Sequence, residues 1–97
     1  YNTSKHAVIG LTKCIALETA KNNITVNAVC PGIVETDIIR NIEKKVVGAG
    51  MSAEEFWTSV EAQNPMGRML QPSEIANIAV FLASSESDGM TGQTIII

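Results

Sequence analysis

Apolar side chains recur at helical spacing along the first part of the chain. From residue 1 to about residue 21 they occupy two adjoining stripes of a predicted helix, and mainly Lys13, Glu18 and Lys21 are left to face water. Because so wide an apolar face needs cover from more than one neighbour, we expect this helix to be buried on two sides. Asn22 and Asn23 end it. The stripes consist of Ala7, Val8, Leu11, Cys14, Ile15 and Leu17.

Two β-branched segments predict strands. Residues 24–30 are almost continuously apolar, as central parallel strands are, and Pro31 and Gly32 end this segment. Residues 93–97 form a second such run. Between the two, a helix is predicted over about residues 37–47, with Thr36 or Asp37 as its cap. Its expected buried face consists of Ile39, Ile42 and Val46.

Two more helices follow from their start signals. Ser52 and Glu55 have the spacing of a capping box, and the helix they open ends before the Asn-Pro sequence at 64–65. A last helix begins near Pro72, which is tolerated in a first turn, and Glu74 complements the helix dipole there. Its apolar face consists of Ile75, Ile78, Ala79 and Leu82.

The order of these elements predicts an α/β fold, part of a doubly wound, Rossmann-like parallel sheet with a small helical lobe. A parallel sheet needs more than two strands and cover on both faces. The chain also starts at Tyr1 without a capping residue before the helix, and it ends within an apolar run. We therefore expect that these 97 residues are a fragment and that the rest of the sheet is missing from them.

Composition excludes several classes of protein. Ten acidic and seven basic residues give a net charge of -3, and the basic residues are scattered, so neither nucleic acid nor a membrane surface is an expected partner. Cys14 and Cys30 lie in apolar stretches without the spacing of metal ligands. We expect two reduced, buried thiols, a cytoplasmic location and no metal site.

Tyr1 and Lys5 are the first candidates for chemistry. Residues four apart on a helix lie on one face, so both side chains can converge on one point. A nearby ammonium group favours the phenolate, which suits the pair to proton transfer. The spacing alone, however, favours a simpler interpretation, a surface tyrosine with an unrelated lysine. His6, the only histidine, is expected to face solvent or to form a local hydrogen bond.

A ligand-binding turn is predicted where the first strand ends. Pro31 and Gly32 lie at its carboxyl end, the edge at which open α/β sheets bind ligands, and glycine allows close approach to the backbone. The Thr36 hydroxyl could donate to a bound amide or phosphate. Its role as a helix cap is at least as well supported by the sequence.

The stretch from residue 38 to residue 70 resembles an adaptable apolar lid. It carries Phe56, Trp57 and three methionines on short helices separated by glycines, and we expect no convergent cluster of charges in it. For each residue alone, ordinary core packing is the better interpretation. Basic residues near Glu43 have the spacing of a solvated face, although an inward role in carboxylate recognition stays open. These are Arg40, Lys44 and Lys45.

Four segments together resemble one family. The sequences YNTSK at 1–5, VNAVCPGIVET at 26–36, GRMLQPSEIA at 67–76 and TGQ at 91–93 are similar, in order and approximate spacing, to the C-terminal half of a short-chain dehydrogenase/reductase, abbreviated SDR. The resemblance covers essentially the whole chain. It implies that residues 1–97 are the C-terminal half of one NAD(P)-binding domain, with residues 37–70 as its variable substrate lobe.

The resemblance also implies roles for single residues. Tyr1 matches the catalytic acid-base tyrosine, and Lys5 matches the lysine that holds the nicotinamide ribose. Pro31 and Gly32 match the turn beside the nicotinamide, where Ile33 offers backbone groups and Thr36 its hydroxyl. The implied function is the interconversion of a carbonyl and a secondary alcohol with NAD or NADP, by a homotetramer or homodimer.

The chain lacks other family features. The glycine-rich phosphate turn, the residue that selects NAD or NADP, and the catalytic serine would precede Tyr1, and the Asp-Gly-Gly usual after the last strand is absent. These residues alone are expected to be inactive. A non-catalytic SDR-like binding or scaffolding protein is the alternative, which the Tyr1 and Lys5 pair disfavours because a scaffold needs neither. An independently folding interaction module is disfavoured by the exposed sheet edge.

Overall fold

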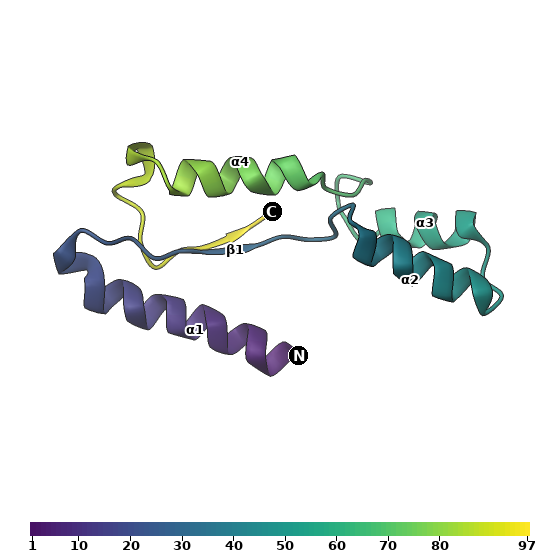
Figure 1. Ribbon diagram of the computed structural model, residues 1–97, viewed down its shortest axis with the longest axis horizontal. Helices are drawn as coiled ribbons and strands as arrows, with labels where there is room; N and C mark the ends of the chain where they lie inside the picture. Colours follow the sequence, from purple (N-terminus) through teal and green to yellow (C-terminus); the bar gives the residue numbers. More distant parts are fainter. The chain divides into compact units, whose positions relative to one another are not determined.

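The computed structural model describes all residues, Tyr1–Ile97, and confirms the α/β class. One α-helix precedes the first strand, and three α-helices lie between the two strands (Figure 1). Contacts divide it into two units, one of Tyr1–Cys30 with Ala76–Ile97, the other of Pro31–Ile75. The elements are α1 (Asn2–Thr19), η1 (Ala20–Asn22), β1 (Ala28–Cys30), α2 (Asp37–Gly48), α3 (Ala53–Glu61), α4 (Pro72–Leu82), η2 (Ser85–Ser87) and β2 (Thr94–Ile96).

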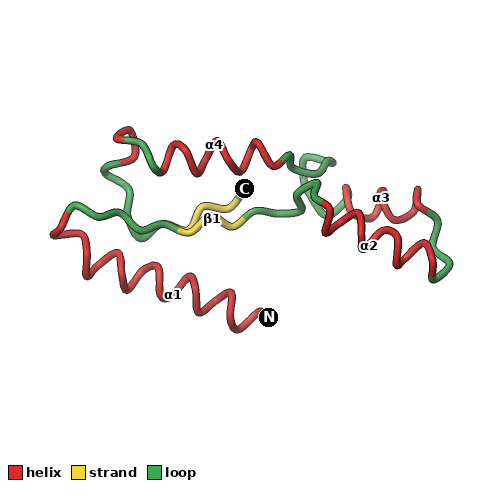
Figure 2. The backbone as a smooth tube through the Cα atoms, in the orientation of Figure 1, coloured by secondary structure: helices red, strands yellow, loops and turns green.

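The first unit contains a parallel pair of strands (Figure 2). β1 pairs with β2 in the register Ala28 to Thr94. The predicted strand over 24–30 is shorter than expected, because the residues before Ala28 bond to a loop rather than to a neighbouring strand. Val26 bonds to the Thr91 hydroxyl and the Gly92 amide, and the Asn27 side chain donates to Met90 O and accepts from Gln93 N.

Helix α1 packs through a face other than the predicted one. Its buried residues are Thr12 and Ala16, whereas Leu17 is 83% exposed, so the predicted burial on two sides is wrong for this structure. The Thr12 hydroxyl donates to Val8 O at 2.8 Å, and Thr19 donates in the same way to Ile15 O. Because these hydroxyls are satisfied within the helix, threonine can lie on the packed face.

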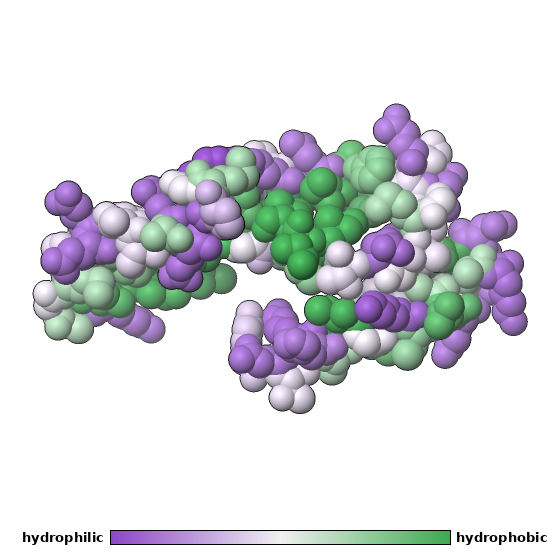
Figure 3. All heavy atoms as spheres, turned by 180° about the vertical axis from the view of Figure 1, so that it is seen from behind, coloured by the Kyte–Doolittle hydropathy of each residue, from purple (hydrophilic) through white to green (hydrophobic).

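The uncovered apolar residues are visible at the surface (Figure 3). Both cysteines are free, but Cys14 is exposed on α1 and Cys30 in β1 is only half-buried, so the predicted burial of two thiols is also wrong. A two-stranded sheet covers only part of the surface of a helix or strand, which explains why Cys14 is exposed and Cys30 is only half-buried. The large exposed apolar side chains on α1 and α4 are Val8, Leu11, Leu17, Val80 and Phe81.

The second unit is built on α2 and α3, which contact each other. Its core consists of Phe56, Val60 and Leu70. The Ser52 hydroxyl accepts a hydrogen bond from Glu55 N at 3.1 Å, which confirms the predicted helix cap. Thr36 occupies the N-cap position of α2 but forms no side-chain cap hydrogen bond.

The buried face of α2 differs in part from the prediction. Ile39 and Val46 are half-covered, but Ile42 is exposed and Glu43 takes part in the covered face instead. In α4, three residues of the expected face are half-buried, namely Ile75, Ile78 and Leu82, whereas Ala79 is exposed. None of the helices combines the length and hydropathy needed to span a membrane.

Candidate functional site

Tyr1 and Lys5 lie together at the start of α1. The Lys5 ammonium is 5.4 Å from the centroid of the Tyr1 ring, and Lys5 N donates to Tyr1 O at 3.0 Å. The helical turn therefore brings the two side chains to one point, as their spacing indicates. The Tyr1 side chain is 91% exposed, so its hydroxyl is accessible to a ligand.

The first turn of α1 is held by local hydrogen bonds. The Ser4 hydroxyl donates to Tyr1 O at 2.7 Å. His6 Nδ1 lies 2.8 Å from Asn2 O, and because a carbonyl only accepts, Nδ1 carries the proton. His6 is exposed and locally bonded, which confirms its predicted role.

The predicted ligand-binding turn, residues 31–36, lies in the second unit. Leu70 fixes its middle on both sides: Leu70 N donates to Ile33 O at 2.9 Å, and Glu35 N donates to Leu70 O at 2.8 Å. Val34 and Leu70 form an isolated parallel bridge, and Leu70 is only 3% exposed. The Thr36 hydroxyl forms only a long contact, 3.4 Å, with Val34 O.

The Glu35 side chain extends this attachment beyond the backbone. Its Oε2 accepts a 2.7 Å hydrogen bond from Gln71 Nε2, and its Oε1 accepts one of 2.8 Å from Arg40. The hydrogen bond from Gln71, with that from Arg40, lowers the pKa of Glu35. The carboxylate thereby connects the turn both to the residue preceding α4 and to α2.

A second ion pair fixes the start of α4. Arg68 donates two hydrogen bonds, of 2.8 and 2.7 Å, to the Glu74 carboxylate. Glu74 also accepts one of 2.7 Å from Gln71 N. The bonds from Arg68 and Gln71 lower the pKa of Glu74 to about 2. Glu74 therefore caps the helix as well as complementing its dipole.

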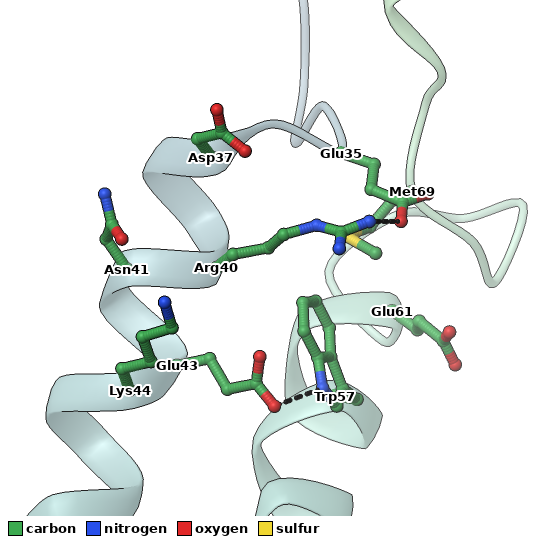
Figure 4. A pocket seen from close by; sticks show the side chains of 9 residues that line it. All are labelled: Glu35, Asp37, Arg40, Asn41, Glu43, Lys44, Trp57, Glu61 and Met69. Carbon is green, nitrogen blue, oxygen red and sulfur yellow. Dashed lines mark hydrogen bonds and ion pairs between the residues drawn. The ribbon is translucent and has the colours of Figure 1, made fainter.

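A groove of about 830 Å³ lies between α2 and α3 (Figure 4). Charged side chains line much of it, so the expectation of an apolar lid is wrong for this surface, although Asp37 and Glu61 point away from Arg40 in Figure 4. Trp57 also has a polar role, since its Nε1 donates to Glu43 Oε1 at 2.9 Å. The charged lining residues are Glu35, Asp37, Arg40, Glu43, Lys44 and Glu61.

The comparison with known proteins identifies the family. The family model described as Enoyl-(Acyl carrier protein) reductase matches residues 1–97. A crystal structure of a short chain dehydrogenase family protein from Francisella tularensis is 44% identical, covers all of this chain and 40% of that chain, and superposes with a TM-score of 0.93. The chain belongs to the short-chain dehydrogenase/reductase family.

Other SDR relatives agree. The uncharacterized oxidoreductase YxjF of Bacillus subtilis is 44% identical over 102 residues, which cover 100% of this chain and 38% of the relative. The crystal structure of an actinorhodin polyketide ketoreductase variant with NADPH is 39% identical, with a TM-score of 0.89, and it covers 100% of this chain and 38% of that chain. This SDR chain thus spans about two-fifths of the length of these relatives.

The sequence of this SDR chain did not indicate the hydrogen bonds of the Glu35 side chain. Its partner Gln71 is 36 positions away, so no local pattern indicates the bond. The polar side of the groove, in contrast, could be recognised from the spacing of polar residues in the sequence. The polar residues Asp37, Arg40, Asn41 and Lys44 follow the spacing i, i+3, i+4, i+7 along one face of α2.

Proposed function

We propose that this chain is the C-terminal part of an NAD(P)-dependent oxidoreductase that interconverts a carbonyl and a secondary alcohol. The chain, residues 1–97, then forms part of one doubly wound NAD(P)-binding domain whose N-terminal half lies outside this chain. The observation that carries the proposal is the approach of the Lys5 ammonium to within 5.4 Å of the Tyr1 ring, in a chain that belongs to the SDR family.

Tyr1 is the proposed acid and base. During reduction its hydroxyl donates a proton to the carbonyl oxygen, and during oxidation its phenolate accepts the proton of the alcohol. The ammonium of Lys5 stabilises the phenolate by its charge. Neither side chain is engaged by a bulky neighbour, since both are exposed at the first turn of α1.

The residues of the turn fit a nicotinamide group. The backbone hydrogen bonds of residues 31–36 use Ile33 O, Glu35 N and Thr36 O and leave the N–H of Ile33 free, and the Thr36 hydroxyl is held only weakly. Ile33 N–H and the Thr36 hydroxyl would therefore bind the carboxamide, beside Pro31 and Gly32, while Lys5 would hold the ribose hydroxyls. When bound, the nicotinamide supplies or accepts the hydride.

The remaining assignments follow from the same proposal. Residues 37–70 form the lobe that contacts a small-molecule carbonyl or alcohol substrate. The full-length protein is a homodimer or homotetramer, acts in the cytoplasm and binds neither nucleic acid nor membrane. Symmetric homo-oligomers are the commonest assemblies of soluble enzymes.

Nicotinamide absorbance tests the proposal in the full-length protein. A panel of uncharged ketones and secondary alcohols is assayed with NADH, NADPH and their oxidised forms. Lys5→Ala is expected to raise the KM for the nicotinamide cofactor and to lower kcat, because Lys5 acts in both binding and chemistry. Lys13→Ala, which removes a charge elsewhere on α1, is the matched control. Equal kinetics for Lys5→Ala and the parent protein would contradict the proposal.

A further inference from the structure

We propose that Glu35 is a positioning residue, whose carboxylate fastens the turn 31–36 to the residue preceding α4 and thereby holds Ile33 and Thr36 in the geometry that binds the nicotinamide group. The inference rests on the proposed function. It assigns Glu35 no part in the reaction itself, only in the arrangement of its neighbours.

Gln71, the hydrogen-bond partner of Glu35, is itself held in place. Gln71 Nε2 donates to Glu35, while Gln71 N donates to Glu74, at 2.7 Å in both cases. Glu74 is held in turn by two hydrogen bonds from Arg68. The Gln71 side chain therefore projects from a backbone whose position is set by a second carboxylate, and Glu35 bonds to a fixed point.

The side chain at the end of the turn is weakly held. Leu70 bonds to Ile33 O and to Glu35 N, and Thr36 O accepts a backbone hydrogen bond from Arg40 N at 3.3 Å. The Thr36 hydroxyl, however, has only a 3.4 Å contact and lacks the side-chain bond of a typical helix cap. Glu35 directly precedes Thr36. A side chain fixed at Glu35 therefore restricts the residue next to it, where the backbone ladder to Leu70 ends.

The two bonds of Glu35 are not equivalent. The Glu35 side chain is 31% exposed, whereas Arg40 is 59% exposed, so solvent screens their ion pair and the long Arg40 side chain loses entropy in forming it. The bond from Gln71 is also exposed, but its donor has a short side chain on a backbone that Glu74 holds, which makes it the stronger constraint on position. Figure 4 shows Arg40 reaching across the groove to Glu35.

A double-mutant cycle tests the connection in the full-length protein. Glu35→Ala, Gln71→Ala and the double variant are compared by titration with NADH and NADPH and by thermal unfolding. If only a tenth to a fifth of the variant molecules keep the turn 31–36 in the conformation that binds the cofactor, the cofactor Kd rises about five- to tenfold. Each single variant should show this rise and the double variant no more, because either change breaks the same bond.

Two further variants distinguish a positioning role of Glu35 from a role in the stability of the fold alone. Glu35→Gln keeps an acceptor for Gln71 and should restore the cofactor Kd to within about twofold of the parent, as expected for a preserved competent fraction. Arg40→Ala removes only the screened ion pair and should likewise change this Kd by less than about twofold. The kcat at saturating cofactor should stay near that of the parent for Glu35→Ala.

The outcomes distinguish this inference from the proposed function. Additive effects in the cycle, or a lowered Tm with an unchanged cofactor Kd, would show that Glu35 is merely structural and would overturn the inference. A parent protein that binds cofactor and turns over substrate, but tolerates Glu35→Ala without loss of affinity, would overturn the inference alone. A parent protein that binds neither NADH nor NADPH would overturn the proposed function together with it.

Discussion

The indole Nε1 of Trp57 donates a 2.9 Å hydrogen bond to the Glu43 carboxylate, and this bond connects α3 to α2 across the groove. Trp57 also meets Phe56 edge to face, with ring centroids 5.0 Å apart. The tryptophan therefore contributes in two ways, through its ring and through its polar edge. Removing only the polar edge separates these contributions.

We predict that Glu43→Ala lowers the free energy of unfolding by about 1 kcal/mol, the usual contribution of one hydrogen bond, and that Trp57→Phe lowers it by more because it also removes ring contacts. Their effects should not add, because both remove the same bond. Urea denaturation of the single and double variants measures the coupling. Glu61→Ala, which removes another carboxylate from the groove, is the control and should change stability little. Full additivity would show that the bond contributes nothing to stability.

The sequence predicts elements well where a local signal defines their ends. Ser52 caps α3 and Pro72 begins α4, as expected from residues within one turn of each helix start. The packed face of α1 was not predictable in the same way. Thr12 counts as polar in any pattern, yet its hydroxyl bonds to Val8 O and leaves the side chain free to be buried.

Contacts between residues far apart in the sequence explain the other differences between the predicted and the observed structure. The strand before Ala28 is cut short because Asn27 bonds to Met90 and Gln93, more than sixty positions away. Glu35 meets Gln71 in the same non-local way. The approach of Lys5 to Tyr1, in contrast, needs only a helix, and the spacing of the two residues shows that their side chains can converge.

Stability in acid should depend on Glu74. Its pKa is about 2 in the folded chain against an ordinary 4.5, so folding favours the ionised form. The stabilisation is complete above pH 4.5 and is lost as the pH falls through this range toward 2. Glu74→Gln should remove this part of the pH dependence.

The measurement for Glu74 is the urea midpoint as a function of pH for the parent and Glu74→Gln. The two curves should differ most above pH 4.5 and should converge as the pH approaches 2. Glu86→Gln, in η2, serves as a control for general loss of negative charge. A constant difference across the whole range would contradict the role of the Arg68 pair.

Self-association of the full-length protein is expected through its exposed apolar helix faces. Leu17 on α1 is a suitable probe, because a lysine there places a charge on this face without disturbing the helix. Leu17→Lys should lower the mass measured by light scattering at a given concentration, whereas Lys21→Glu in η1 should not. A parent protein that is already monomeric at all concentrations would refute the expectation.

Substrate selectivity should reside in residues 37–70. Exchanging this segment with that of an SDR of different preference should shift the ratio of kcat/KM for the two substrates toward that of the donor enzyme. Pocket contacts of this kind are worth about 1–3 kcal/mol per methylene, or roughly tenfold or more in the ratio. An unchanged ratio would place selectivity outside this segment.

Proton transfer by the Tyr1 hydroxyl is tested by the kinetics of Tyr1→Phe in the full-length protein. This change removes one oxygen from an exposed ring and leaves Lys5 in place. We predict that kcat falls by about a hundred- to ten-thousandfold, the usual contribution of a general acid or base, while the Kd for NADH or NADPH stays nearly the same. A Tyr1→Phe protein with the turnover of its parent would show that Tyr1 does not transfer the proton.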